Sequence, residues 1–448
     1  MTVRRVRLAR PFGSSGDQGP FRTTILSLGA IVIAAGLLAV AASDVAASVL
    51  VLAVGFLTIL LAANRMPFVL VPTFIGLGVR LAAFTYHRLV GPLPQASDAV
   101  VFERRAERLA ELPVSEHFQR FGTGSDSVAW LAAWLLRAFG PETVVPQLVM
   151  VVLGALLVIS TAQLARALGA SERMVVIAAW AMALFPQPIV HSALLLREIP
   201  FSLLITVAAV FLVRWERTAD PRYAVLGALG MLAASVFHVA AIVLFLAALA
   251  YVLIRSTRTS NIVRALASVV SVLALAGFVV STDYIGEELG GSLEEVEMVY
   301  FAREARAPVG GAAYPEELRI RNVGEIWKAP ARVALFLFAP LPWMVTTARQ
   351  ALGVLDSVLY AAAAMFVAHG ARSWRRGSRF GGARLLLVLL FVGVLVFSLN
   401  VANFGTAIRH RAKFAPYVVA VAVLAVGAPR ADTGTRPGSG TGPQHSSA

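Results

Sequence analysis

Three polar clusters interrupt a chain that is otherwise strongly apolar, and they contain the residues best suited to chemistry. They are Asp98, the Arg197-Glu198 pair and the segment Arg409-His410-Arg411. A carboxylate can act as a general base or bind a divalent cation. Guanidinium groups bind phosphate through two parallel hydrogen bonds. These residue types indicate a reaction on an anionic substrate, and the phosphate of a lipid carrier is the obvious candidate in a membrane.

The composition predicts that these clusters sit in a membrane protein. Of the 448 residues, 58% are hydrophobic and only 14% are charged. Several windows reach the ~18 apolar residues that cross ~30 Å of hydrocarbon. We therefore expect an all-α fold: a polytopic helical membrane protein with about 12 transmembrane helices. Interfacial or re-entrant helices are expected in the first and last large outer loops.

Charge and cysteine content narrow the possibilities further. The net charge of +14 comes almost entirely from arginine, and most arginines fall in short loops between apolar segments. This placement indicates that the arginines set the orientation of the chain in the membrane rather than bind nucleic acid. The absence of cysteine excludes disulfides, thiolate metal sites and cysteine nucleophiles. The bias toward Ala, Val, Leu and Arg is typical of a bacterium with a GC-rich genome.

The arginine-rich loops assign a topology in the plasma membrane. Residues 1–22 are predicted to be a cytoplasmic basic tail, residues 23–429 a single transmembrane domain, and residues 430–448 a disordered cytoplasmic tail. The predicted spans are 23–43, 46–63, 67–87, 143–165, 174–192, 199–213, 223–237, 239–254, 265–281, 351–371, 384–401 and 414–428. Both termini are then cytoplasmic. A single helix over 223–254 remains an alternative, and it would reverse the predicted topology of every later segment.

Two outer loops are predicted to cover an extracytoplasmic site, at residues 88–142 and 282–350. In the first, Asp98–Leu112 is amphipathic at helical spacing and Val128–Phe139 is too short to span, so both are expected at the interface. In the second, the apolar stretch 332–345 is interrupted by Pro340 and Pro342, which favours a re-entrant or interfacial hairpin.

Each candidate residue also has a structural interpretation. Asp98 could simply cap its helix. The Arg197-Glu198 pair could anchor a helix end, and the 409–413 segment could be an ordinary cytoplasmic basic loop. Arg80, inside a predicted span, could extend its charged end to the interface or pair with an acidic group or a lipid phosphate. His238, at a hinge between two short spans, and Asp356 are weaker candidates.

The arrangement resembles the polytopic GT-C-type membrane glycosyltransferases, in particular the bacterial branch related to dolichyl-phosphate-mannose protein mannosyltransferases and to exopolysaccharide-associated proteins. The matching segments are Ser97-Asp98 with the amphipathic helix that follows, Trp130–Gly140, Leu195–Pro200, Phe338–Trp343 and Asn403–Arg411. The chain departs from that pattern in having one carboxylate where an adjacent acidic pair is common, two additional early spans, and His238 where arginine is frequent.

The resemblance implies inverting transfer of a sugar from a polyprenyl-phosphate donor to an extracytoplasmic glycan, lipid or protein acceptor in the cell envelope, as in polysaccharide biosynthesis. Asp98 would be the general base or a cation ligand, and Glu198 the supporting acid. A divalent cation, Mg²⁺ or Mn²⁺, could then bind Asp98 and Glu198. The implied substrate-binding residues are Arg80, Arg197, His238, Arg409, His410 and Arg411.

Two other functions remain open at this level. A polysaccharide polymerase or ligase would use the same outer arginines on a lipid pyrophosphate. A non-enzymatic lipid-sugar transporter would place charge through the middle of the bundle, whereas the deep spans here are nearly free of charge. No phosphate-binding loop, dinucleotide fingerprint or His-Glu-x-x-His motif occurs in the chain. No nucleic-acid partner is expected.

Overall fold

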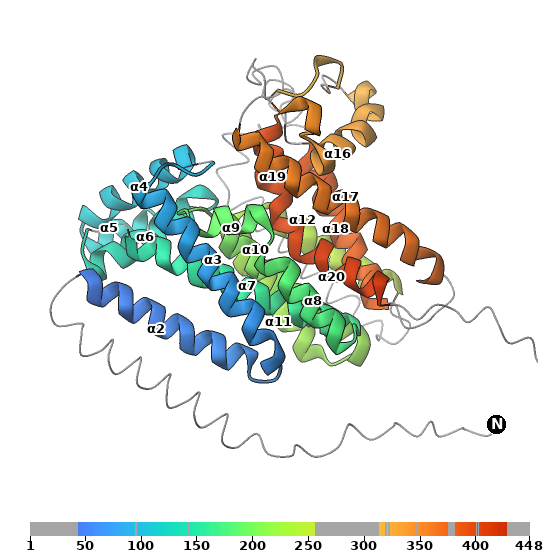
Figure 1. Cartoon of the computed structure of the whole chain (residues 1–448), viewed down its shortest axis with the longest axis horizontal. Helices are drawn as coiled ribbons and strands as arrows, with labels where there is room; N and C mark the ends of the chain where they lie inside the picture. The colour runs from blue at the N-terminus through green and yellow to red at the C-terminus, as the bar shows by residue number, and fades with distance from the viewer. Residues whose placement is uncertain are drawn as a thin grey trace, which may run out of the picture.

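The computed structural model of the chain is a bundle of helices (Figure 1). It describes residues 44–255, 313–374 and 381–427, except positions 95, 142–143, 319, 321–322, 346–347, 400 and 402. The α-helices in this part are α2 (Asp44–Ala63), α3 (Leu70–Leu89), α4 (Ala96–Glu111), α5 (Val114–Gln119), α6 (Ser125–Phe139), α7 (Val144–Leu168), α8 (Glu172–Ala183), α9 (Pro186–Ser192), α10 (Glu198–Thr218), α11 (Pro221–Phe237), α12 (Ala240–Arg255), α16 (Ala329–Phe338), α17 (Ala348–Trp374), α18 (Gly381–Leu399), α19 (Phe404–Arg411) and α20 (Ala415–Val426).

The remaining elements are short. The 3₁₀ turns are η1 (Pro67–Val69), η2 (Glu316–Leu318), η3 (Val323–Lys328), η4 (Pro342–Met344) and η6 (Ala412–Phe414). One isolated antiparallel bridge joins Ala313 to Asn403. The expected all-α polytopic fold is therefore confirmed.

Six of the predicted spans each correspond to one long apolar helix in the described residues: 46–63, 67–87, 143–165, 199–213, 351–371 and 384–401. Within the described residues, six helices are long and apolar enough to cross a membrane, or up to seven if a bent pair counts as one span. The predicted spans at 23–43 and 265–281, like the tails at 1–22 and 430–448, lie outside the described residues. The stretch 223–254 forms two shorter helices that meet at His238, so the alternative of one long helix is wrong.

Proline breaks one predicted span. The sequence predicts a single helix over 174–192, but the segment divides into α8 and α9, which are bent by 56° relative to each other. Pro186 opens α9, because a proline ring clashes with the preceding turn and lacks the N–H that a helix needs. The interfacial hairpin expected near Pro340 and Pro342 is likewise short: α16 ends at Phe338 and η4 follows.

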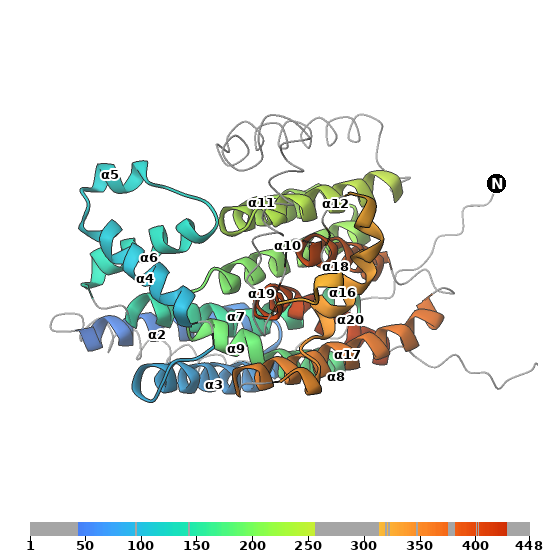
Figure 2. The same cartoon turned by 90° about the horizontal axis from the view of Figure 1, so that it is seen from above.

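The bundle is layered (Figure 2). Helices α11 and α12 form one side, α10 and α18 lie beneath them, α7 and α20 come next, and α3, α8 and α17 form the opposite side. The amphipathic α4 packs on α6, and this pair stands beside the bundle near one end of α7. Buried apolar side chains run continuously through these layers.

The acidic clusters and the basic loops occupy opposite ends of this bundle. Glu198 opens α10 and Arg217 lies in its last turn, and 21 residues at 1.5 Å each separate the two ends by about 30 Å. At the far end, Arg166 donates to the Arg65 carbonyl at 2.8 Å and Arg217 donates to the Ala167 carbonyl. The arginines predicted to be cytoplasmic therefore meet at the end remote from Glu198.

This separation predicts a labelling pattern. Because the chain has no cysteine, Ser115→Cys and Ser171→Cys each introduce one thiol, and both serines are exposed. We expect a membrane-impermeant maleimide added to intact cells to label position 115 and not position 171, which should react only after permeabilisation. Labelling of both from one side would contradict the predicted topology.

Candidate functional site

Arg409 links the two acidic residues that the sequence places far apart. Its Nε donates to Oε1 of Glu198 at 2.7 Å and its Nη2 to Oε2 at 3.3 Å, while its Nη1 donates to Oδ2 of Asp98. Asp98 and Glu198 lie 311 and 211 residues away from Arg409 along the chain. The fold thus brings one guanidinium and two carboxylates from α4, α10 and α19 to a single point.

The two carboxylates have different surroundings. The side chain of Glu198 is 1% exposed, whereas that of Asp98 is 46% exposed. Glu198 lies in the first turn of α10, where the unpaired N–H groups of a helix favour a negative charge. Glu198 is therefore a fixed, buried partner for Arg409, and Asp98 is the carboxylate that an incoming molecule can reach.

Asp98 does not act simply as a helix cap. Helix α4 begins at Ala96, so Asp98 lies within its first turn and its carboxylate accepts from Arg409. The packing of α4 on α6 holds the helix in place, and Gln147 of α7 donates to Glu103. An exposed pair between Arg105 and Asp126 at the start of α6 adds little to this packing, which sets the direction in which Asp98 projects.

Glu198 also contacts a cluster of basic and aromatic side chains around Lys413. Nζ of Lys413 lies 3.7 Å from Oε1 of Glu198 and 2.6 Å from Nδ1 of His410. The same ammonium group lies 4.7 Å from the ring centre of Phe397 and 5.4 Å from that of Phe201. Aromatic faces attract a cation, so they offset part of the cost of burying Lys413.

Burial keeps the imidazole in this cluster neutral. Burial lowers the pKa of His410 well below its ordinary value, and the charge of Lys413 lowers it further. The short contact with Lys413 fits a neutral ring, because only an unprotonated Nδ1 can accept a hydrogen bond. His238 lies 5.6 Å from His410 between ring centres and 4.7 Å from Phe397. Both predicted histidines thus border the site as uncharged rings.

Arg197 borders the same cluster. It is the residue before α10, and its charge acts on Glu198, His238 and His410. Its guanidinium lies against Gly124, where a Cβ atom would come within 2.9 Å of Nη1. Arg197, Arg409 and Lys413 together outnumber the two carboxylates, so the site suits an anionic ligand.

Arg80 belongs elsewhere. It is completely buried and donates to the carbonyls of Gly76 and Ala183 at 3.0 Å, to that of Met182 at 3.3 Å, and to Oγ of Ser192 at 3.3 Å. Met182 and Ala183 are the last residues of α8, whose carbonyls lose their helical partners at the bend. The sequence allowed Arg80 to extend to the interface or to pair with an acidic group, but among the described residues it does neither and instead stabilises the broken span.

Arg411 points away from Arg409 into a separate network. Its side chain is fully buried and pairs with Asp356 at 3.0 Å, and it also donates to Ser357. Further donations go to the carbonyls of Phe336, Leu337, Ala339 and Gly353. Because Nε, Nη1 and Nη2 all donate within this network, Arg411 fixes α19 to α16 and α17. Its guanidinium is not directed toward a lipid phosphate beside Arg409.

The predicted site is thus partly assembled. The structure brings together Asp98, Arg197, Glu198, His238, Arg409 and His410, and it separates Arg80 and Arg411 from them. Lys413 was not predicted as a site residue. The signal available was its rarity, since Lys328 and Lys413 are the two lysines in the chain.

The two carboxylates do not form a ready metal site. In the part of the chain that the structure describes, no group of three or more His, Cys, Asp or Glu side chains could hold an ion. Arg409 already occupies the space between Asp98 and Glu198. The arrangement therefore does not fit an ion bound by both carboxylates.

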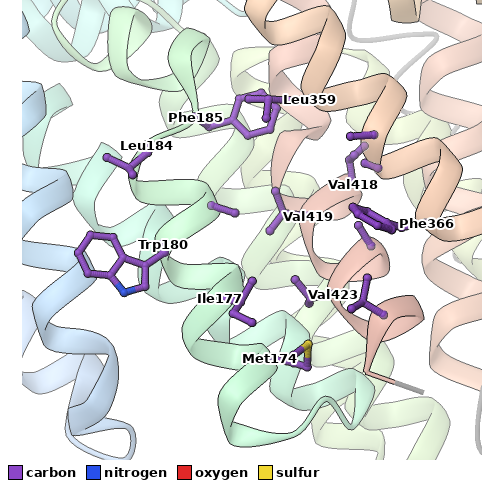
Figure 3. A pocket seen from close by; sticks show the side chains of 15 residues that line it. Met174, Ile177, Trp180, Leu184, Phe185, Leu359, Phe366, Val418, Val419 and Val423 are labelled. Atoms are coloured by element: carbon purple, nitrogen blue, oxygen red, sulfur yellow. The ribbon is translucent and has the colours of Figure 1, made fainter. Parts of the chain in front are cut away.

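An apolar pocket of about 560 Å³ lies between α8, α17 and α20 (Figure 3). All of its lining residues are apolar or aromatic, from Phe185 and Leu359 at one end to Met174 near the other. Phe185 packs edge-on against Tyr360 with ring centres 5.7 Å apart, and the Tyr360 hydroxyl donates to the Arg411 carbonyl. The pocket therefore ends close to the helix that carries Arg409.

Comparison with known proteins gives little beyond this geometry. No protein-family model and no curated protein matches the chain. Among solved structures it is similar to the archaeal oligosaccharyltransferase AglB from Archaeoglobus fulgidus in complex with an inhibitory peptide and a dolichol-phosphate, with 12% identity and a TM-score of 0.46. The match covers 81% of this chain and 50% of that one, so the chain spans about half of its length. A likeness this weak says nothing about activity.

The Arg411 network predicts a large loss of stability when it is broken. Removing one partner of a buried pair typically costs about 3–5 kcal/mol, because the other charge is left uncompensated. We expect Arg411→Met to lower the thermal unfolding temperature of the purified protein in detergent. Arg105→Gln is the matched control, since its exposed pair with Asp126 should contribute about 0–1 kcal/mol. Equal effects of the two changes would contradict a structural role for Arg411.

Proposed function

We propose that the protein is a membrane glycosyltransferase that moves a sugar from a polyprenyl-phosphate donor to an extracytoplasmic acceptor. The observation that carries this proposal is the placement of Arg409 between a buried carboxylate and an exposed one. Glu198 fixes the guanidinium, so Arg409 can stabilise a departing phosphate without moving. Asp98 is the group placed to receive a proton from an acceptor hydroxyl.

These positions support an inverting transfer. The acceptor oxygen attacks the anomeric carbon of the sugar from the side opposite the phosphate, and a new glycosidic bond forms. The bond from that carbon to the phosphate oxygen breaks, and the electron pair leaves with the lipid phosphate beside Arg409 and Arg197. The acceptor proton passes to Asp98. Attack from the opposite face inverts the configuration of the sugar.

The apolar pocket supports a lipid-linked donor. Its walls are almost entirely apolar, and Phe185 lies at its upper end in Figure 3. Phe185 packs on Tyr360, whose hydroxyl donates to the Arg411 carbonyl of α19. A prenyl chain lying there would bring its phosphate toward the helix that carries Arg409. Burial of each CH₂ group is worth about 0.8 kcal/mol, so even part of a prenyl chain would anchor the donor.

The rival functions use the same features differently. A polymerase or ligase would bind a lipid pyrophosphate and transfer an oligosaccharide, and the basic excess around Glu198 is compatible with either phosphate. A transporter would need ionic groups along a path through the bundle. The buried arginines in the described residues are instead paired to helix carbonyls or to Asp356. Because these buried arginines are paired, they do not form an ionic path. This favours sugar transfer at one end of the bundle over transport through it.

Removal of the Asp98 charge tests the proposed chemistry. Loss of a general base typically lowers kcat by about 10²–10⁴-fold, so we expect Asp98→Asn to abolish detectable glycan transfer while expression and membrane insertion stay unchanged. Asp126→Asn, another partly exposed aspartate in an arginine pair, is the control and should transfer normally. Full activity of Asp98→Asn would remove this residue from the mechanism.

A bulky side chain in the pocket tests the lipid donor. Ala362 lines the pocket on α17, whereas Ala364 on the same helix is exposed and does not line it. We expect Ala362→Phe to raise the KM for a long-chain polyprenyl-phosphate sugar and to leave kcat unchanged, with no effect from Ala364→Phe. A short-chain donor should be used equally by both variants. An unchanged KM in Ala362→Phe would separate the pocket from donor binding.

A further inference from the structure

The space between the two site carboxylates holds a cation that belongs to the chain itself. The guanidinium of Arg409 forms a two-pronged contact with Glu198, at 2.7 Å and 3.3 Å, and turns its third nitrogen to Asp98. A divalent cation bound by two carboxylates would place a positive charge between them, and the guanidinium of Arg409 does the same here. The chain supplies that positive group from α19.

Three of the four oxygen atoms of Asp98 and Glu198 already accept hydrogen bonds from Arg409. Mg²⁺ binds near-ideal octahedra of oxygen at about 2.0–2.1 Å, usually through one or two carboxylates. Both oxygens of Glu198 and Oδ2 of Asp98 accept from Arg409. A second cation at the same oxygens would lie within a few ångströms of the guanidinium, where like charges repel strongly in a buried setting.

The burial of Glu198 and Arg409 stabilises the guanidinium in its position between the two carboxylates. Glu198 is 1% exposed, Arg409 is 13% exposed and Lys413 is completely buried. A buried carboxylate needs a partner, and Glu198 has two, because Lys413 lies 3.7 Å from the oxygen that Arg409 also contacts. These two basic groups outnumber the single carboxylate of Glu198 that would attract an ion.

We propose that Arg409 takes the position and the electrostatic role of a divalent cation, so that transfer proceeds without a metal. This inference rests on the proposed function for its account of the reaction. A guanidinium has five N–H donors, and three of them serve the two carboxylates. The other two can donate to the oxygens of a phosphate as its bond to the sugar breaks. The ligand class is therefore a phosphate ester anion.

Manganese binding tests the inference without any substrate. Mn²⁺ titrations of the purified full-length protein, followed by electron paramagnetic resonance, should show no ion bound at the site in the wild type. Arg409→Gln should gain one bound Mn²⁺ per chain, and the further change Asp98→Asn should remove it. Arg105→Gln is the matched control: it frees Asp126 from its exposed pair and should gain no ion.

Two outcomes would overturn the inference. One is a wild-type protein that binds one Mn²⁺ and loses it in Asp98→Asn. The other is an Arg409→Gln variant that unfolds at the wild-type temperature yet binds no Mn²⁺. If Arg409→Gln does not fold, the wild-type titration alone still decides, since it needs no variant of Arg409.

Activity measurements separate this inference from the proposed function. Transfer by the wild type should have the same rate in excess chelator and in excess Mg²⁺, and Arg409→Gln should lose about 10²–10³-fold in kcat. Transfer that stops in chelator and returns with Mg²⁺ would overturn the inference and leave the glycosyltransferase assignment intact. A wild type that transfers no sugar under either condition would overturn the proposed function, whatever the Mn²⁺ titration shows.

Discussion

Backbone carbonyls at the ends of helices must find donors when the helices end inside an apolar bundle, and this structure meets the requirement with arginine. In the described residues, three buried arginines do so: Arg80 at the end of α8, Arg411 at the end of α16, and Arg332 at the end of α18. The Arg332 guanidinium donates to the carbonyls of Ser398, Leu399 and Val401. A guanidinium suits this task because its donors fan out in one plane and its charge complements the negative end of a helix.

Arg409 differs from these arginines, and the difference identifies the site. Its donors go to two carboxylates and, in the described residues, to no helix carbonyl. The adjacent turn depends on Arg411, which ties α19 to α16 and α17 and so fixes the direction of Arg409. A structural arginine and a site arginine, two residues apart, thus point in opposite directions from one short helix.

Much of the fold could be predicted because apolar length and arginine placement are local properties. The spans at 46–63, 67–87, 143–165 and 199–213 correspond to helices within a few residues. The bend at Pro186 was missed, because proline disfavours a continuous helix but neighbouring contacts decide whether it kinks or breaks. Here Arg80 and Ser192 lie at the break, and Arg80 donates hydrogen bonds to the buried carbonyls that lose their helical partners there.

The sequence by itself determined an all-helical membrane protein, since hydrophobic length acts along the chain. Only the tertiary structure decided which charges meet. Arg80, Arg409 and Arg411 look alike in sequence, yet one stabilises a broken helix, one bridges two carboxylates and one secures α19. The reason is that a guanidinium takes its role from the acceptors around it, and those acceptors come from helices as many as 311 residues away.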